Sequence, residues 1–136
     1  MSEPAKHSSK KQSKIFNLLA KLAEDVAVPI NSARHAAAVI IGNEVVGLGV
    51  NSRKSDPFAA KYGRNRNSIY RHAETMAIKN ALNRVGEREL SQATLYVVRR
   101  KKTEQNGIMI FGNSKPCSGC QQCINAYNIK KVIWST

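Results

Sequence analysis

Apolar residues recur at helical spacing early in the chain and then give way to short continuous runs. Residues 15–26 carry apolar side chains with a helical period, which predicts an amphipathic helix that covers one face of a sheet. Pro29 is expected to end this helix because proline cannot continue its hydrogen bonding. The apolar runs 36–41 and 44–50 flank Gly42-Asn43, and this pattern predicts an antiparallel hairpin with a tight turn.

The second half of the chain alternates between helical and extended patterns. Residues 72–85 predict a helix that stops at Gly86, and residues 93–98 predict a third strand. Asn106-Gly107 is a strong turn signal, so the short apolar run after it indicates an inserted hairpin or an extended strand. A further helix and a last strand over residues 132–134 complete the pattern.

Length and composition fit one domain. A chain of 136 residues with 42% hydrophobic residues can bury one core but has no room for two full domains. Residues 1–12 are polar and basic and are expected to form a flexible arm, so that the folded domain spans residues 13–136. Three cysteines argue against a disulfide framework and favour a reducing, cytoplasmic setting. No apolar run approaches the roughly 20 residues of a membrane span, and the start of the chain lacks the apolar core of a signal peptide.

The formal net charge of +13 is the strongest bias in the composition. A basic chain of this size attracts polyanions, so a nucleic-acid partner is one expectation. The cations are spread over the arm, residues 64–71 and residues 99–102, where some could hold the phosphate of a single nucleotide. A solubilising surface explains the same charge without any ligand.

The last strand bears on the oligomeric state. Residues 132–134 would form an apolar edge of the sheet, and proteins usually cover such edges. We therefore expect a homo-oligomer.

Two short motifs carry the chemistry. His72-Ala73-Glu74 and Pro116-Cys117-Ser118-Gly119-Cys120 each open a helical segment. His72, Cys117 and Cys120 are zinc-type ligands, while Glu74 would point beside the metal. Three protein ligands leave a fourth position for water, which is the arrangement of a catalytic zinc site. Zinc lowers the pKa of such a water toward about 7, and Glu74 is suited to act first as general base and then as general acid, so the implied reaction is hydrolytic loss of ammonia.

The cysteine motif also has less specific explanations. A lone C-x-x-C can be a redox pair or half of a structural zinc site. Neither explanation accounts for the histidine and the glutamate, and a structural site needs four protein ligands. Cys123 is a competing ligand, but it lies about 120° further round the helix, which favours a small buried core residue. His35 and His7 are weaker candidates, assigned to structural or surface positions.

The two motifs resemble the signature of the zinc-dependent cytidine deaminase superfamily, H-x-E followed by P-C-x-x-C. The likeness extends to residues 47–51, 93–98 and 130–136, which are similar to the second, third and fourth strands of that family. The resemblance implies an α/β fold, a three-layer α/β/α cytidine deaminase-like architecture with a central mixed β-sheet that is shortened at the C-terminus.

Substrate contacts are expected from two sources. The resemblance implies that Asn51 holds the substrate sugar and that a backbone N–H near Ala73 helps to fix the ring of the base. Residues 52–71 are too long for a mere connector, and they lead into the helix that carries the first motif. We therefore expect their aromatic side chains, Phe58 and Tyr70, to contact the substrate, although a solvated surface loop would also fit.

Three functions fit these observations. The favoured prediction is a zinc-dependent hydrolytic deaminase that converts a small-molecule cytosine nucleoside or nucleotide to the uracil product. The first alternative is a deaminase of cytosine or adenosine in RNA or DNA, similar to the tRNA adenosine deaminases, which the charge of +13 favours. The second is a zinc-containing nucleic-acid-binding module without turnover, which would have no use for Glu74. An aromatic content of 6% and a long loop favour an enclosed pocket for a small pyrimidine.

Overall fold

Strands and helices alternate along the chain. The computed structural model describes residues 2–4, 10–26, 34–55, 57–61, 70–103 and 107–136. Its strands are β1 (Ser2–Pro4), β2 (Arg34–Ile41), β3 (Glu44–Val50), β4 (Ser52–Ser55), β5 (Tyr70–Arg71), β6 (Thr94–Lys102), β7 (Met109–Gly112) and β8 (Lys131–Trp134). Its helices are α1 (Lys10–Glu24), α2 (Pro57–Lys61), α3 (Ala73–Leu82), the 3-10 helix η2 (Glu87–Gln92) and α4 (Ser118–Ala126). None of these described helices is long and apolar enough to cross a membrane.

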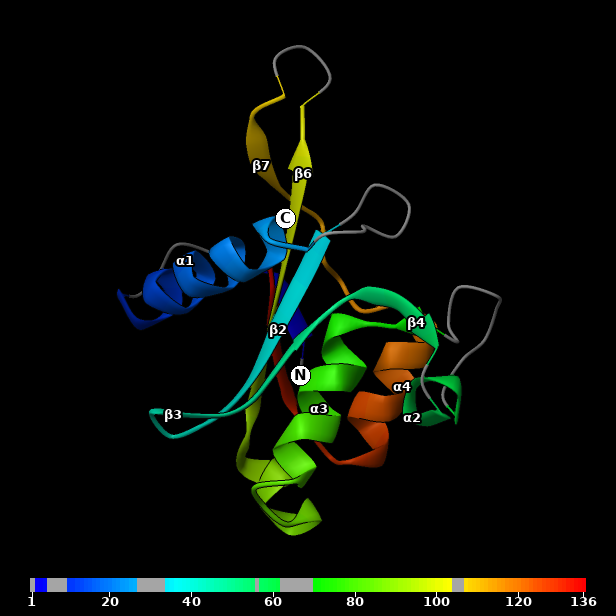
Figure 1. Ribbon diagram of the computed structural model, residues 1–136. Coiled ribbons are helices and arrows are strands. Elements are labelled where there is room, and N and C mark those ends of the chain that lie inside the picture. Colours follow the sequence, from blue (N-terminus) through cyan, green and yellow to red (C-terminus); the bar gives the residue numbers. More distant parts are fainter. Residues whose placement is uncertain (1, 5–9, 27–33, 56, 62–69, 104–106) are drawn as a thin grey trace.

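A six-stranded sheet organises the fold (Figure 1). Its strand order is β1-β8-β6-β2-β3, and β7 pairs with β6 outside this row. β6 runs parallel to β8, β8 runs parallel to β1, and the other neighbours are antiparallel. The sheet is therefore mixed, as predicted, while β4 and β5 form a separate two-stranded sheet.

Helices cover both faces of the central sheet. α1 lies on one face, and α3 and α4 lie on the other (Figure 1). Side chains alternate along β2, so that Ala36, Ala38 and Ile40 pack in the core with α1. Ala37 and Val39 pack in the core with α3 and α4. Both faces are thus buried, which explains the continuous apolar run in the sequence and confirms the three-layer α/β/α architecture.

The two hairpins expected from turn signals are present. β2 and β3 pair with Ile41 opposite Glu44, and Gly42 between them has a φ of 63°. That left-handed conformation suits glycine, which has no Cβ. β6 and β7 pair with Lys102 opposite Met109, and this inserted hairpin extends beyond the rest of the sheet (Figure 1).

The edge of β8 differs from the prediction. β1 pairs with β8 in parallel register, with Ser2 opposite Val132 and Pro4 opposite Trp134. The backbone groups that would form an exposed edge are therefore paired over these residues. For this reason the self-association that we expected no longer follows from an open edge at β8.

Element boundaries also differ at α1 and after β3. α1 begins at Lys10, inside the segment expected to be an arm, and it ends at Glu24. Pro29, the expected end of this helix, lies outside the described residues. Residues 52–71 contain β4, α2 and β5, with residues 56 and 62–69 outside the described part.

Candidate metal centre

The N-termini of α3 and α4 meet on one face of the sheet. His72 is the N-cap residue of α3, and Cys117 is the N-cap residue of α4. α3 approaches β3 closely because β3 carries glycine at the contact. A Cβ at Gly49 would overlap the carbonyl oxygen of Ala73. The Gly-Leu-Gly sequence of β3 therefore lets the start of α3 lie directly against the end of the strand.

Buried serines hold the segment that leads into α4. Ser114 Oγ donates to the carbonyl oxygen of Val97 at 2.9 Å, and the N–H of Ser135 donates to Ser114 Oγ at 2.8 Å. Ser135 Oγ donates to the carbonyl oxygen of Gly112 at 2.8 Å. Because Ser114 shortly precedes Cys117, these bonds fix the second motif to the sheet. The sequence pattern did not point to these serines, since their role depends on which strands are neighbours.

His72, Cys117 and Cys120 bring three donor atoms to within 4.8 Å of one another. His72 Nδ1 lies 3.7 Å from Cys117 Sγ and 3.3 Å from Cys120 Sγ. At usual bond lengths, a nitrogen and a sulfur that share a tetrahedral zinc lie about 3.5 Å apart. The spacing fits zinc, and so does a donor set of one imidazole and two thiolates. We call these three residues the metal group.

The two thiols of the metal group differ in acidity. The hydrogen bond from the Cys120 thiol is the main reason why the pKa of Cys117 falls to about 3. The same bond, together with burial, raises the pKa of Cys120 well above its usual range. The backbone N–H of Cys120 also donates to Cys117 Sγ at 3.5 Å, as expected for a thiolate at a helix N-terminus. One thiolate is thus preformed, and metal binding would release the remaining proton.

Glu74 lies beside the metal group and is not part of it. The residue is 6% exposed, and burial raises the pKa of its carboxyl group above the usual value. The charge of the neighbouring His72 acts in the opposite direction and partly offsets this rise in the pKa of Glu74. A carboxyl group with a raised pKa beside a metal group is suited to take up and release a proton during a reaction.

Asn51 ties the end of β3 to β2. Its Oδ1 accepts a hydrogen bond from the N–H of His35 at 2.8 Å, and its own N–H donates to the His35 carbonyl oxygen at 3.3 Å. Asn51 is buried at the end of β3 that lies against the start of α3. Ala73, the first residue of α3, is fully buried there. The substrate contacts expected of both residues stay predictions.

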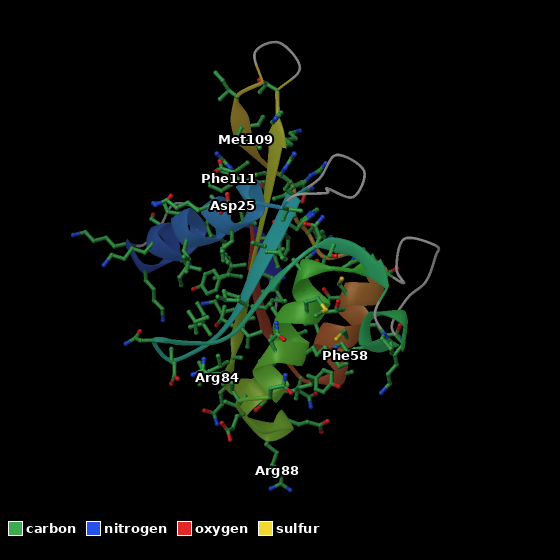
Figure 2. All side chains as sticks on the ribbon, viewed as in Figure 1. Asp25, Phe58, Arg84, Arg88, Met109 and Phe111 are labelled. Carbon is green, nitrogen blue, oxygen red and sulfur yellow. The ribbon has the colours of Figure 1, made fainter. Side chains whose placement is uncertain are left out.

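Phe58, labelled in Figure 2, belongs to α2 and packs against the core on the face of α3 and α4. Its ring stacks on Tyr127, with the ring centroids 6.1 Å apart and an interplanar angle of 24°. Tyr127 and Cys117 cap opposite ends of α4 and are about 15 Å apart along the helix. This contact gives Phe58 a packing role, and the substrate contact expected of it stays a prediction. The backbone of Tyr70 lies in β5, and its side chain lies outside the described part of the chain.

Cys123 is a core residue, as predicted. It is fully buried in the apolar cluster beneath α3 and α4, and it is not part of the metal group. Burial raises the pKa of its thiol to about 12. The protonated form is therefore strongly favoured, which disfavours metal ligation.

His35 and Arg99 are neighbours in the sheet, which the sequence did not predict. His35 was expected at a structural or surface position, and it lies half-buried in β2 opposite Arg99 of β6. Burial, the charge of Arg99 and the charge of His72 lower the pKa of His35 to about 4. The strand register brings these side chains together, and a linear pattern carries no signal for it.

Three solved structures show how widely this fold occurs. The dCMP deaminase of cyanophage S-TIM5, in complex with dCMP and dUMP, is 14% identical with a TM-score of 0.60, over 96% of this chain and 86% of that one. Guanine deaminase from Bacillus subtilis is 16% identical with a TM-score of 0.55, over 97% of this chain and 64% of that one. RibD from Acinetobacter baumannii is 17% identical with a TM-score of 0.57, over 92% of this chain. This chain spans only 28% of the length of RibD. At identities of 14–17%, these similarities show a shared fold and nothing more specific.

The sequence itself identifies the family. No match was found among curated proteins. The family model for the cytidine and deoxycytidylate deaminase zinc-binding region, however, matches residues 9–136. The match includes both motifs, α3, α4 and the strands that support them. The chain therefore belongs to the cytidine and deoxycytidylate deaminase family that this zinc-binding region defines.

Proposed function

We propose that this protein is a zinc-dependent hydrolytic deaminase that converts a cytosine nucleoside or nucleotide to the corresponding uracil compound and releases ammonia. Family membership supports a hydrolytic deaminase. The observation that carries the proposal is the buried carboxyl group of Glu74 beside the metal group. A structural zinc site, with its ligands all from the protein, would have no use for such a group.

Each residue near the metal group has a distinct part in the proposed reaction. Zinc, when held by His72, Cys117 and Cys120, supplies an activated water as nucleophile at neutral pH. Glu74 takes a proton from the attacking water and gives it to the ring nitrogen N3 as the oxygen adds to C4. It then carries the remaining proton of that oxygen to the amino group, so that the carbon–nitrogen bond breaks, the carbonyl group forms and ammonia leaves. The N-termini of α3 and α4 direct positive dipole ends at the same place, which favours negative charge that develops on the ring.

The proposed substrate, a cytosine compound, has less specific support than the proposed reaction type. The family description names cytidine and deoxycytidylate, and the cyanophage dCMP deaminase of similar fold binds dCMP and dUMP. Guanine deaminase and RibD have the same fold at similar identity, so fold alone does not select the base. The burial of Asn51 at the end of β3, beside the first motif, supports the proposal that this residue contacts the sugar.

A deaminase of bases in RNA or DNA is the second candidate function. The β6–β7 hairpin extends beyond the sheet and carries the exposed cations Lys101 and Lys102 (Figure 1). Ile108 and Ile110 are exposed on the same hairpin, at 58% and 39%. Cations beside apolar side chains on a ribbon are suited to hold the phosphates and bases of a single strand.

Ammonia release by the zinc-loaded protein tests both functions. The substrates are cytidine, deoxycytidine, their monophosphates, adenosine, guanine, and oligonucleotides that contain cytosine or adenine. Turnover of a monomeric cytosine compound is the expected result. Activity confined to oligonucleotides would favour the second candidate, and activity on guanine or adenosine alone would refute the cytosine assignment.

Glu74→Gln is the control for the mechanism. The variant keeps the size and polarity of the side chain, so fold and zinc content should be retained. Turnover should fall by roughly 10²- to 10⁴-fold, the usual contribution of a general acid–base group. Retained activity would remove Glu74 from the proposed mechanism.

A further inference from the structure

A row of four residues crosses the sheet between the two motif-bearing helices. Asn51 is joined to His35 by two hydrogen bonds, and His35 lies opposite Arg99 in the register of β2 and β6. Arg99 lies opposite Gly112 in the register of β6 and β7. The row starts where α3 meets β3 and ends in the strand that leads into α4. It therefore spans the sheet between the N-termini of α3 and α4.

The side chains of this row lie on the face that carries α3 and α4. In β2, Ala36 packs in the core with α1, so His35 before it lies on the opposite face. In β6, Val98 packs with α1, while Val97 packs with α3 and α4. Arg99 follows this alternation and shares the face of Val97. His35 and Arg99 thus lie side by side on the metal-group face.

The guanidinium group of Arg99 has one buried nitrogen, Nε, without a hydrogen-bond partner in the described part of the chain. The side chain lies across Gly112, where a Cβ would come 3.0 Å from Arg99 Cδ. The backbone is fixed as well, since the N–H of Arg99 donates to Ser135 Oγ at 3.0 Å. Native structures satisfy most buried donors, so an unsatisfied one at a site calls for a ligand or another cause.

Arg100, the next residue in β6, is an arginine whose contacts within the protein are complete enough to give it a packing role. Arg100 forms an ion pair of 3.0 Å with Glu24 and lies 4.4 Å from the ring centroid of Phe111, on the α1 face. Phe111 lies near the end of α1 in Figure 2. Among the described residues, Arg99 has no carboxylate partner of this kind.

His35 does not compete with Arg99 as a cation. Burial, Arg99 and His72 lower the pKa of His35 to about 4, so the imidazole is neutral at pH 7. The electrostatic influence of His72 and Cys117 on His35 also indicates that this ring lies near the metal group. Arg99 is therefore the charged member of the row at neutral pH, with the neutral His35 and Asn51 beside it.

We propose that Arg99 binds the phosphate group of a nucleoside monophosphate substrate, and that Asn51 and His35 line the space between this phosphate and the metal group. This inference rests on the proposed deaminase function. A guanidinium group matches phosphate oxygens with two parallel hydrogen bonds, which a neutral sugar hydroxyl cannot replace. A nucleoside without phosphate would leave Arg99 unpaired, so the site selects nucleotides over nucleosides.

Matched variants test this selectivity. Arg99→Gln is expected to lower kcat/KM for CMP or dCMP by roughly 10- to 100-fold and to leave the value for cytidine or deoxycytidine nearly unchanged. Gly112→Ala keeps the charge but pushes the Arg99 side chain aside, so a smaller loss with the same selectivity is expected. Arg100→Gln is the control, because it removes a cation from the same strand on the other face. Its nucleotide-to-nucleoside ratio should equal that of the parent protein.

Binding measurements separate this inference from the proposed function. Zinc-loaded Glu74→Gln protein, with and without Arg99→Gln, is titrated calorimetrically with the 5′-monophosphates of cytidine, uridine, adenosine and guanosine. Binding that Arg99→Gln abolishes supports the phosphate site even where no cytosine compound is turned over. A nucleotide-to-nucleoside ratio that Arg99→Gln leaves unchanged overturns the inference while the deaminase function stands. Failure of all four monophosphates to bind, or Arg99-dependent binding of oligonucleotides alone, also overturns it.

Discussion

Among single residues, two cysteines of α4 have opposite expected roles. Cys120 Sγ lies 3.3 Å from His72 Nδ1, while Cys123 is buried in the apolar core. We expect Cys120→Ala to lose zinc on dialysis and Cys123→Ala to retain it, with a loss of about 1–2 kcal/mol in unfolding free energy from the small cavity. Zinc analysis and urea unfolding of both variants check this. Loss of zinc from Cys123→Ala would place that sulfur among the ligands.

His35 leads to a prediction about the pH dependence of stability. Burial, Arg99 and His72 lower its pKa from 6.5 to about 4 in the folded chain. Between these values the unfolded state binds a proton and the folded state does not, so the unfolding free energy falls as the pH drops from 6.5 toward 4. His35→Gln should reduce this slope by roughly 1 kcal/mol per pH unit.

Urea unfolding at several pH values, with metal chelated in both proteins, measures this slope. Chelation removes the separate effect of pH on zinc binding. Equal slopes in the parent and in His35→Gln would assign the pH dependence to another group.

The sequence predicted those site residues whose chemistry is local. Cys117 and Cys120 lie together because positions three apart at the start of a helix have a fixed spacing, which a linear motif records. His72 joins them where the N-terminus of α3 meets that of α4. His35 and Arg99 are neighbours through strand register, and that register depends on the packing of the whole sheet. Phe58 is an aromatic residue whose partner, Tyr127, could not be chosen from the pattern.

At the level of elements, the close packing of α3 on β3 positions the metal group. A Cβ at Gly49 would overlap backbone atoms of Ala73 and Ala77. Gly49→Ala must therefore push α3 away from β3, with an expected loss of about 1–3 kcal/mol in stability. Zinc binding should weaken too, because His72 caps the displaced helix.

Gly86→Ala is the matched control for this packing, since the nearest atom to its added Cβ would be 3.8 Å away, an ordinary contact. Thermal unfolding and zinc titration of the two variants provide the comparison. If Gly49→Ala keeps parental stability and zinc affinity, the close approach of α3 is not what positions His72.

Helices and strands could be predicted from the sequence where two local signals agreed. The β2–β3 and β6–β7 hairpins combine apolar runs with a turn that contains glycine, and both are present. β1 gave no such signal, because Ser2–Pro4 is polar and contains proline. Its extended conformation depends on pairing with β8, a strand near the other end of the sequence. A short strand of this kind is specified by its partner and not by its own residues.

For the molecule as a whole, the prediction concerns the edge of the sheet that β1 covers. Ser2–Pro4 pairs with Val132–Trp134, and β8 buries Val132, Ile133 and Trp134 in the cores on its two faces. Deletion of residues 2–9 would leave the backbone groups on this side of β8 unpaired, and an unpaired apolar edge associates with other chains. We expect concentration-dependent association in light scattering and a melting temperature lower by roughly 3–6 °C for a loss of about 1 kcal/mol.

The deletion also removes one acidic and one basic side chain, Glu3 and Lys6, although the net charge stays the same. A Glu3→Gln/Lys6→Gln variant removes the same two charges and leaves the backbone of β1 in place, so it should behave like the parent protein. Association in this double variant as well would show that these charged side chains, rather than strand pairing, keep the chains apart. A deletion variant that stays monodisperse and melts like the parent would mean that three paired residues contribute too little to protect β8, and that another part of the molecule limits association at this edge.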